Sequence, residues 1–156
     1  MKEFIPWADE LSVGIEEIDE QHKILVRLIN RLYDETVKAQ PDPTVVDGIL
    51  NDLVQYTIIH FSLEESLFRI FDFPYYDAHK KQHEDLKNEV ISIQAKFRAG
   101  EKPINLELIH FLRKWLREHI MGTDKKYTGF FLEKGLKGSW TKRSWIGKIW
   151  DSVYAK

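Results

Sequence analysis

The chain has 156 residues, of which 43% are hydrophobic and 31% charged, and this composition fits one globular domain. It contains no cysteine, which excludes disulfides, thiolate metal sites and a cysteine nucleophile. The net charge of −2 argues against a general nucleic-acid binder, so we expect no nucleic-acid partner. We expect a cytoplasmic protein, because no apolar signal-like segment follows the N-terminus and no run of about 18 apolar residues would span a membrane.

Charge is distributed unevenly along the chain. Residues 137–156 contain five basic residues and one acidic residue, a balance of +4 that leaves −6 for the other residues. We therefore predict two parts: a compact domain over residues 1–134, and a basic, tryptophan-rich tail over residues 135–156.

The first part of the chain is predicted to be an arm followed by a helix. Residues 1–18 lack regular periodicity, so we expect an N-terminal arm that packs through Trp7 and Ile15. A helix is then predicted from an Asp19 N-cap to the break at Pro41, because apolar residues recur on one face at helical spacing.

Three further helices follow in chain order. The second is predicted from a Thr44 N-cap to Pro74, and the third over residues 75–99, with Gly100 as the residue that closes it. The fourth is predicted to begin after an Asn105 N-cap and to end near Gly122. Amphipathic helices with short connections and no strand-like alternation predict an all-α, up-down-up-down four-helix bundle.

Polar side chains interrupt the apolar faces of all four helices. Each of the last three helices carries a pair, and the first carries a single histidine: His60 and Glu64, His79 and His83, His119 and Asp124, and His22. Residues four apart on a helix lie one above the other, with Cβ atoms roughly 5–6 Å apart, so such pairs can hold a metal together. A lone buried histidine is usually a hydrogen-bonded core residue. Five imidazoles and two carboxylates in one core are too costly to bury without something to bind, so they predict a metal site.

The last pair has a different spacing. Asp124 is five residues beyond His119, which puts it about 140° around an ideal helix. Gly122 lies between them. We therefore expect a π-type widening or a helix end at this point, which would turn Asp124 back toward the other residues.

The ligand types restrict the metal. Seven ligands are too many for one tetrahedral zinc ion, and calcium and magnesium prefer shells made only of oxygen. Imidazoles combined with bridging carboxylates suit a pair of iron ions, while zinc and manganese pairs stay open as alternatives.

These residues resemble the complete ligand set of the hemerythrin family, its bacterial branch in particular. The resemblance covers about residues 7–132. It rests on His22, His60-x-x-x-Glu64, His79-x-x-x-His83 and His119-x-x-x-x-Asp124, and on the flanking Gly14, Asp19-x-Gln21, Phe61, Glu65, Trp115-Leu116 and Ile120.

The resemblance implies a di-iron centre and a ligand for it. One iron would take the imidazoles of His79, His83 and His119, and the other those of His22 and His60. Two bridging carboxylates, Glu64 and Asp124, and an oxo or hydroxo group would join the two irons. The second iron would be one ligand short, and dioxygen would bind there.

The resemblance also assigns a pocket for the bound dioxygen. Leu116 resembles the family residue that faces dioxygen, and Trp115, Phe61 and Leu25 are further candidates. For each of them, packing in the core is the alternative role. Three polar residues near the ligands are predicted not to be ligands: His110, which should face solvent, Glu65, which should point off the metal face, and Asp19, which should be a cap.

We interpret the chain as an oxygen-binding protein for storage, delivery or sensing, and not as an enzyme. The histidine-rich ligand set favours binding, because many di-iron enzymes that activate oxygen use carboxylate-rich sites. Three alternatives stay open: a di-iron enzyme acting on peroxide or nitric oxide, an oxidase, and an iron-buffering domain.

The tail is predicted to form an extra amphipathic helix. Its apolar positions repeat at helical spacing: Trp145, Ile146, Ile149, Trp150, Val153 and Tyr154. Such a helix would fold back onto the bundle, lie on an anionic membrane surface or dock a protein partner through residues 140–154. The oligomeric state stays open.

Overall fold

The computed structural model describes residues 3–101 and 103–134, and every regular element within them is helical. Three helices are continuous: α1 (Glu16–Thr36), α2 (Pro43–Ile70) and α3 (Tyr76–Arg98). The fourth rod consists of α4 (Leu106–Glu118), a π-helical segment (His119–Asp124) and α5 (Lys125–Glu133). The predicted tail, residues 135–156, lies outside the described residues.

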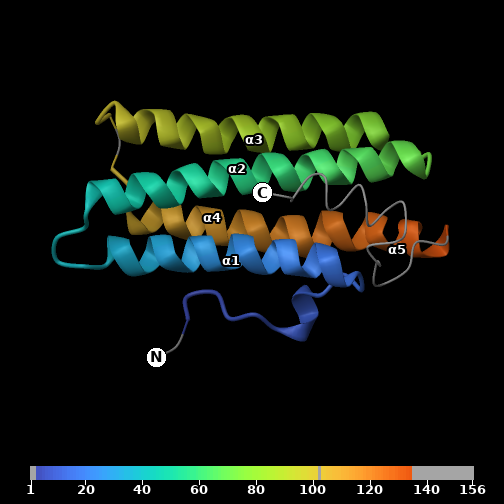
Figure 1. The fold of residues 1–156 in the computed structure, drawn as a ribbon, viewed down its shortest axis with the longest axis horizontal. Helices are drawn as coiled ribbons and strands as arrows, with labels where there is room; N and C mark the ends of the chain where they lie inside the picture. The colour runs from blue at the N-terminus through green and yellow to red at the C-terminus, as the bar shows by residue number, and fades with distance from the viewer. Residues whose placement is uncertain (1–2, 102, 135–156) are drawn as a thin grey trace.

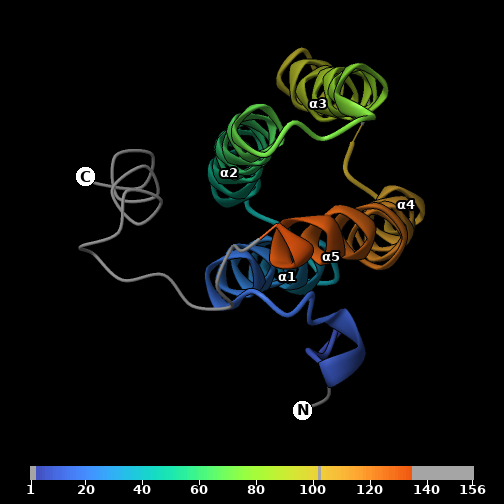
Figure 2. The same ribbon diagram turned by 90° about the vertical axis from the view of Figure 1, so that its right-hand side faces the viewer.

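The four rods form the predicted up-down-up-down bundle. Each rod runs antiparallel to the one before it (Figure 1), and the end-on view shows the four rods arranged around a common axis (Figure 2). None of the helices in the described part of the chain is long and apolar enough to cross a membrane.

Two predicted helix ends are confirmed. The side chain of Asn105 caps α4, because its Oδ1 accepts a hydrogen bond from the backbone N–H of Leu108 at 2.9 Å. Gly100 follows α3 with a φ of 71°, a left-handed conformation that suits glycine at this position.

Two predicted caps are wrong. The cap of α2 is Asp42, whose carboxylate accepts from the backbone N–H of Thr44. Asp19 already lies inside α1 and reaches back to the arm, where it accepts from the Ser12 hydroxyl at 2.6 Å and the Val13 N–H at 2.8 Å. A short carboxylate bonds whichever unpaired donor is nearest, and the sequence does not show on which side of the helix start that donor lies.

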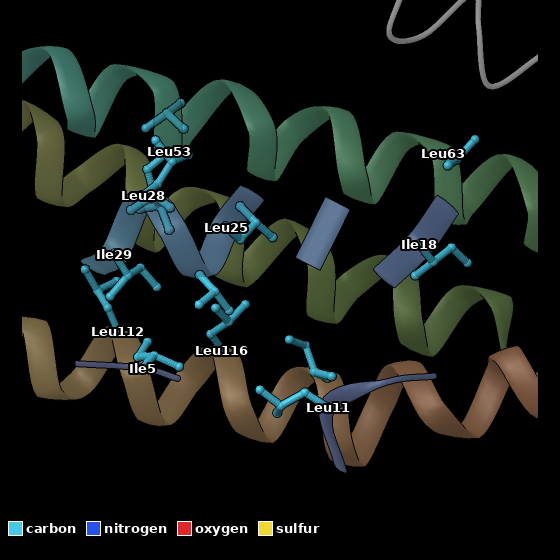
Figure 3. Packing of buried hydrophobic residues seen from close by; sticks show 14 of the residues in the cluster. Ile5, Leu11, Ile18, Leu25, Leu28, Ile29, Leu53, Leu63, Leu112 and Leu116 are labelled. Carbon is cyan, nitrogen blue, oxygen red and sulfur yellow. The ribbon is translucent and has the colours of Figure 1, made fainter. Parts of the chain in front are cut away.

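The N-terminal arm is part of the core. Ile15 is fully buried and Trp7 half-buried, as predicted, and Ile5 and Leu11 are buried as well. Figure 3 shows Ile5 and Leu11 among the buried leucines and isoleucines of the bundle. The side chain of Asn30 fixes the arm, because it accepts from the N–H of Ile5 at 2.7 Å and donates to its carbonyl at 2.9 Å.

Candidate metal centre

Six of the seven predicted ligands meet in the interior of the bundle. Their ligating atoms form two groups, each within 4.8 Å: His22, His60, Glu64 and Asp124, and Glu64, His83 and His119. All six side chains are buried, at 4% exposure or less. Glu64 belongs to both groups, so the groups are adjacent halves of one site.

Glu64, on α2, divides its two oxygens between the halves. Its Oε1 lies 2.5 Å from Nε2 of His60, which is one turn earlier on the same helix. Its Oε2 lies 3.1 Å from Nε2 of His83, on α3. A carboxylate placed in this way can bind one metal ion with each oxygen.

Asp124, at the end of the π-helical segment, is divided in the same way. Its Oδ2 lies 2.5 Å from Nε2 of His22, and its Oδ1 lies 3.0 Å from Nε2 of His119. The buried hydroxyl of Tyr127 donates a hydrogen bond to Oδ1, and the Thr128 hydroxyl donates to the backbone carbonyl of Asp124 at 2.9 Å. The two carboxylates therefore connect the same two sets of imidazoles.

The predicted π-type widening is present between His119 and Asp124. A π-helix pairs residues five apart, so it returns Asp124 to the side of the rod that carries His119. Gly122 is not required for steric reasons, because a Cβ built on it would meet nothing within 4 Å. The spacing of five, rather than the glycine, is the feature that identifies the segment.

Several ligating atoms are buried without a hydrogen bond. Both oxygens of Glu64 and the Nε2 atoms of His83 and His119 have no hydrogen-bond partner among the described residues, although Nε2 of His83 faces Glu64 and Nε2 of His119 faces Asp124. Leaving a buried polar atom unpaired costs about 1–3 kcal/mol, and more when it is charged. Metal ions between these atoms would satisfy all of them, so the residues fit a two-metal centre.

The two carboxylates of the site carry negative charge. Burial lowers the pKa of His60, but the carboxylates of Glu64 and Asp124 outweigh burial and raise it to about 10. Burial and Asp124 raise the pKa of Glu64, but His60 and His83 outweigh them and lower it to about 2. Despite burial, His119 and His22 hold the pKa of Asp124 well below its ordinary value. Both carboxylates are therefore ionised at neutral pH.

His79, the seventh predicted ligand, lies beside the site but outside both groups. It is half-buried, and its ring packs among aromatic rings at centroid distances of 5.6 Å to Phe68, 5.2 Å to Phe73 and 5.8 Å to Tyr127. Its buried Nδ1 has no hydrogen-bond partner among the described residues. Its role as a ligand stays a prediction.

Two aromatic residues predicted for the oxygen pocket line the site. The ring of Phe61 stacks on His83 at 4.0 Å with an interplanar angle of 3°, and Trp115 stacks on His119 at 6.0 Å and 10°. Both rings contact the His83 and His119 half. The Phe61 ring also lies 5.9 Å from the His60 ring, in the half where the resemblance places dioxygen.

The two leucines predicted for the pocket are part of the buried core. Leu25, three residues after His22, is 2% exposed, and Leu116, three residues before His119, is 1% exposed. Figure 3 shows them on two neighbouring helices, α1 and α4. Leu25 therefore lies about one helical turn from His22, in one half of the site, and Leu116 lies about one turn from His119, in the other half.

The sequence did not predict that two polar residues next to ligands contact the imidazoles. Gln21 accepts a hydrogen bond from Nδ1 of His60, and the Glu65 carboxylate lies 3.2 Å from Nδ1 of His83. Glu65 is in neither metal-binding group, as predicted, and its carboxylate contacts the His83 nitrogen that faces away from the site. Their only sequence signal was a polar residue directly beside a ligand on the same helix. His110 is exposed, as predicted.

The sequence matches the family model described as the hemerythrin HHE cation binding domain over residues 13–131. The chain belongs to the hemerythrin family. Curated relatives include the bacteriohemerythrin of Stenotrophomonas maltophilia, 36% identical over 78% of this chain and 77% of the relative, and that of Pseudomonas aeruginosa, 33% identical over 88% and 93%. The bacteriohemerythrin of Methylococcus capsulatus is 32% identical over 77% of this chain and 90% of the relative.

Solved hemerythrin structures share the fold. A leucine-to-tyrosine mutant of a hemerythrin superimposes with a TM-score of 0.77 at 27% identity, covering 83% of this chain and 98% of that one. A wild-type hemerythrin gives a TM-score of 0.75 at 29% identity, covering 81% and 96%. The matched residues 13–131 include both groups of residues that could hold a metal ion.

Proposed function

We propose that this protein binds dioxygen reversibly at a non-haem di-iron centre and does so without enzymatic turnover. The observation that carries the proposal is the placement of the carboxylate oxygens: Glu64 and Asp124 each direct one oxygen toward each set of imidazoles. Membership of the hemerythrin family supports iron as the metal and dioxygen as the ligand. Storage, delivery and sensing are all compatible with such a site.

The ligands would be shared unequally between two ions. His22 and His60 would hold one ion, and His83 and His119, with His79 as the third imidazole, would hold the other. The first ion then has one protein ligand fewer, which leaves a position for a small molecule. Iron held by these residues would supply the electrons that dioxygen takes up on binding and returns on release.

The protein around the site would make that binding reversible. Neutral imidazoles add no negative charge to the ions, so they stabilise high oxidation states less than carboxylates do. The buried side chains of Leu25, Leu116 and Phe61 would exclude water and protons from the bound molecule. The site is therefore suited to holding dioxygen more than to cleaving it.

Two measurements test the proposal. Protein made in iron-replete medium should contain two irons per chain, and its reduced form should gain a stable charge-transfer band in air that disappears on removal of oxygen. About one iron per chain, or zinc bound in preference to iron, would contradict the di-iron assignment. Irreversible oxidation with turnover of added peroxide or nitric oxide would instead make the protein an enzyme.

A further inference from the structure

Two polar side chains contact imidazoles of the site on the side that faces away from the candidate metal positions. Oε1 of Gln21 lies 2.5 Å from Nδ1 of His60, and Oε2 of Glu65 lies 3.2 Å from Nδ1 of His83. Gln21 is 2% exposed, and the Glu65 side chain is 20% exposed. Each one contacts the nitrogen that faces away from the site, so each can fix the orientation of one imidazole.

The two contacts belong to different halves of the site. His60 is grouped with His22, and His83 is grouped with His119. The outer Nδ1 atoms of His22 and His119 have no hydrogen-bond partner among the described residues. Each half therefore contains one imidazole with such a partner.

The partners differ in charge. Gln21 offers a neutral amide oxygen and Glu65 a carboxylate. An imidazole N–H that donates to a carboxylate becomes a stronger metal ligand through its other nitrogen, because the negative charge pushes electron density into the ring. The electron-donating power of His83 should therefore exceed that of His60.

We propose that Glu65 and Gln21 are positioning residues that make the two metal positions unequal. Glu65 strengthens His83, so the position next to His83 and His119 binds a divalent ion more tightly and fills first. Gln21 orients His60 without strengthening it, which leaves the other position weaker. The inference rests on the proposed two-metal centre and adds an order of filling to it.

A titration of the metal-free protein with Co²⁺, followed by visible absorption, tests the proposal. The wild-type protein should bind two ions in two steps of different affinity. Glu65→Gln should weaken the tighter step by about 10–100-fold and leave the other unchanged. Gln21→Glu should act in the opposite sense and tighten the weaker step. An unequal number of imidazoles would also give two steps, but it would not respond to these substitutions.

A matched control separates this effect from a loss of charge on the protein. Glu89 is exposed on α3, and Glu89→Gln removes the same charge without touching the site, so both steps should stay as in the wild type. Melting of each metal-free variant, followed by circular dichroism, shows whether it folds. If Glu65 or Gln21 had only a structural role, its substitution would change this melting temperature but would not change the affinity of one binding step alone.

Three results would overturn the proposal. They are equal titrations of Glu65→Gln and Glu89→Gln, equal weakening of both steps by Glu65→Gln, and failure of Gln21→Glu to tighten the weaker step. If Glu65→Gln does not fold, Gln21→Glu decides the question by itself. A wild-type protein that takes up fewer than two ions would contradict the proposed function instead, so the two failures are distinguishable.

Discussion

Glu64 and Asp124 differ from the histidines of the site because each offers two oxygens, one to each half. Glu64→Ala or Asp124→Ala should therefore disturb both metal positions and remove most of the iron. The loss of affinity should exceed the roughly 10–100-fold that is typical of losing an outer hydrogen-bond partner of a ligand. His110→Ala is the control, because His110 is exposed on α4, where it contacts the Phe4 ring and Arg113 and belongs to neither group of candidate ligands. Equal iron loss in all three variants, measured by metal analysis, would contradict the assignment.

Leu116 is predicted to control oxygen release rather than metal retention. Leu116→Ala should keep two irons but oxidise faster in air, because the smaller side chain admits water to the site. The cavity should also cost about 2–5 kcal/mol of stability. Leu112, one turn earlier on α4 and 1% exposed, is the matched control for that packing loss. Equal autoxidation rates in Leu116→Ala and Leu112→Ala would place the pocket elsewhere.

His60 makes metal binding depend on pH. In the absence of metal its pKa, lowered by burial but raised further by Glu64 and Asp124, is about 10, so the imidazole is protonated at neutral pH. Metal needs the neutral imidazole and should displace this proton, so the apparent affinity should rise with pH. Calorimetric titrations in two buffers with different ionisation enthalpies measure the proton released. Equal enthalpies in both buffers would show that none is released.

The same raised pKa affects the stability of the metal-free protein. A group whose pKa is higher in the folded state than its ordinary value of 6.5 stabilises the fold fully below that value. This contribution is lost as the pH rises through about 10. The melting temperature of the metal-free protein should therefore decrease between these two pH values.

The sequence predicts ligands better than it predicts their partners. The two histidine–carboxylate pairs and His83 were recognisable because burying such side chains on apolar faces is costly without a metal. Gln21 and Glu65 gave no such signal, because a polar residue at the edge of an apolar face is ordinary. Their roles depend on the rotation of two helices against each other, which periodicity does not specify.

At the scale of elements, two glycines beside the bundle core should respond differently to alanine. Gly14 precedes α1 with a φ of 85°, and a Cβ there would lie 3.5 Å from Cδ1 of Leu132. Gly14→Ala should therefore cost about 1–2 kcal/mol, measured by thermal or denaturant unfolding. Gly122→Ala, in the π-helical segment, should be neutral or slightly stabilising and should keep the metal, because its Cβ meets open space.

A larger loss of stability in Gly122→Ala than in Gly14→Ala would show that the π-helical segment needs glycine.

The sequence pointed to a widened turn through both the spacing of His119 and Asp124 and the presence of Gly122, and the structure supports only the first reason. Helix number and order were predictable from apolar periodicity and from prolines. The starts of α1 and α2 were not predictable. Asp19 and Asp42 are equally good acceptors in sequence, and only the chain path decides that Asp42 caps α2 whereas Asp19 binds the N-terminal arm.

At the scale of the whole molecule, the candidate metal centre connects all four rods of the bundle, since each rod contributes at least one residue of the two groups. Binding of metal should therefore stabilise the fold as a unit. A ligand that binds only the folded state at 100 times its dissociation constant adds about 2.7 kcal/mol. All six grouped residues lie between His22 and Asp124.

Truncation before Ser139 separates the bundle from the tail. The truncated protein should keep two irons and the optical spectrum of the oxygenated form, since α5 ends at Glu133 and the truncation removes none of the six grouped residues. Removing a basic, tryptophan-rich segment should alter association with anionic vesicles, a protein partner or a second copy. Co-sedimentation with anionic vesicles and the solution mass, each measured with and without residues 139–156, separate these possibilities. Loss of iron or of helical structure on truncation would instead make the tail part of the domain that holds the metal.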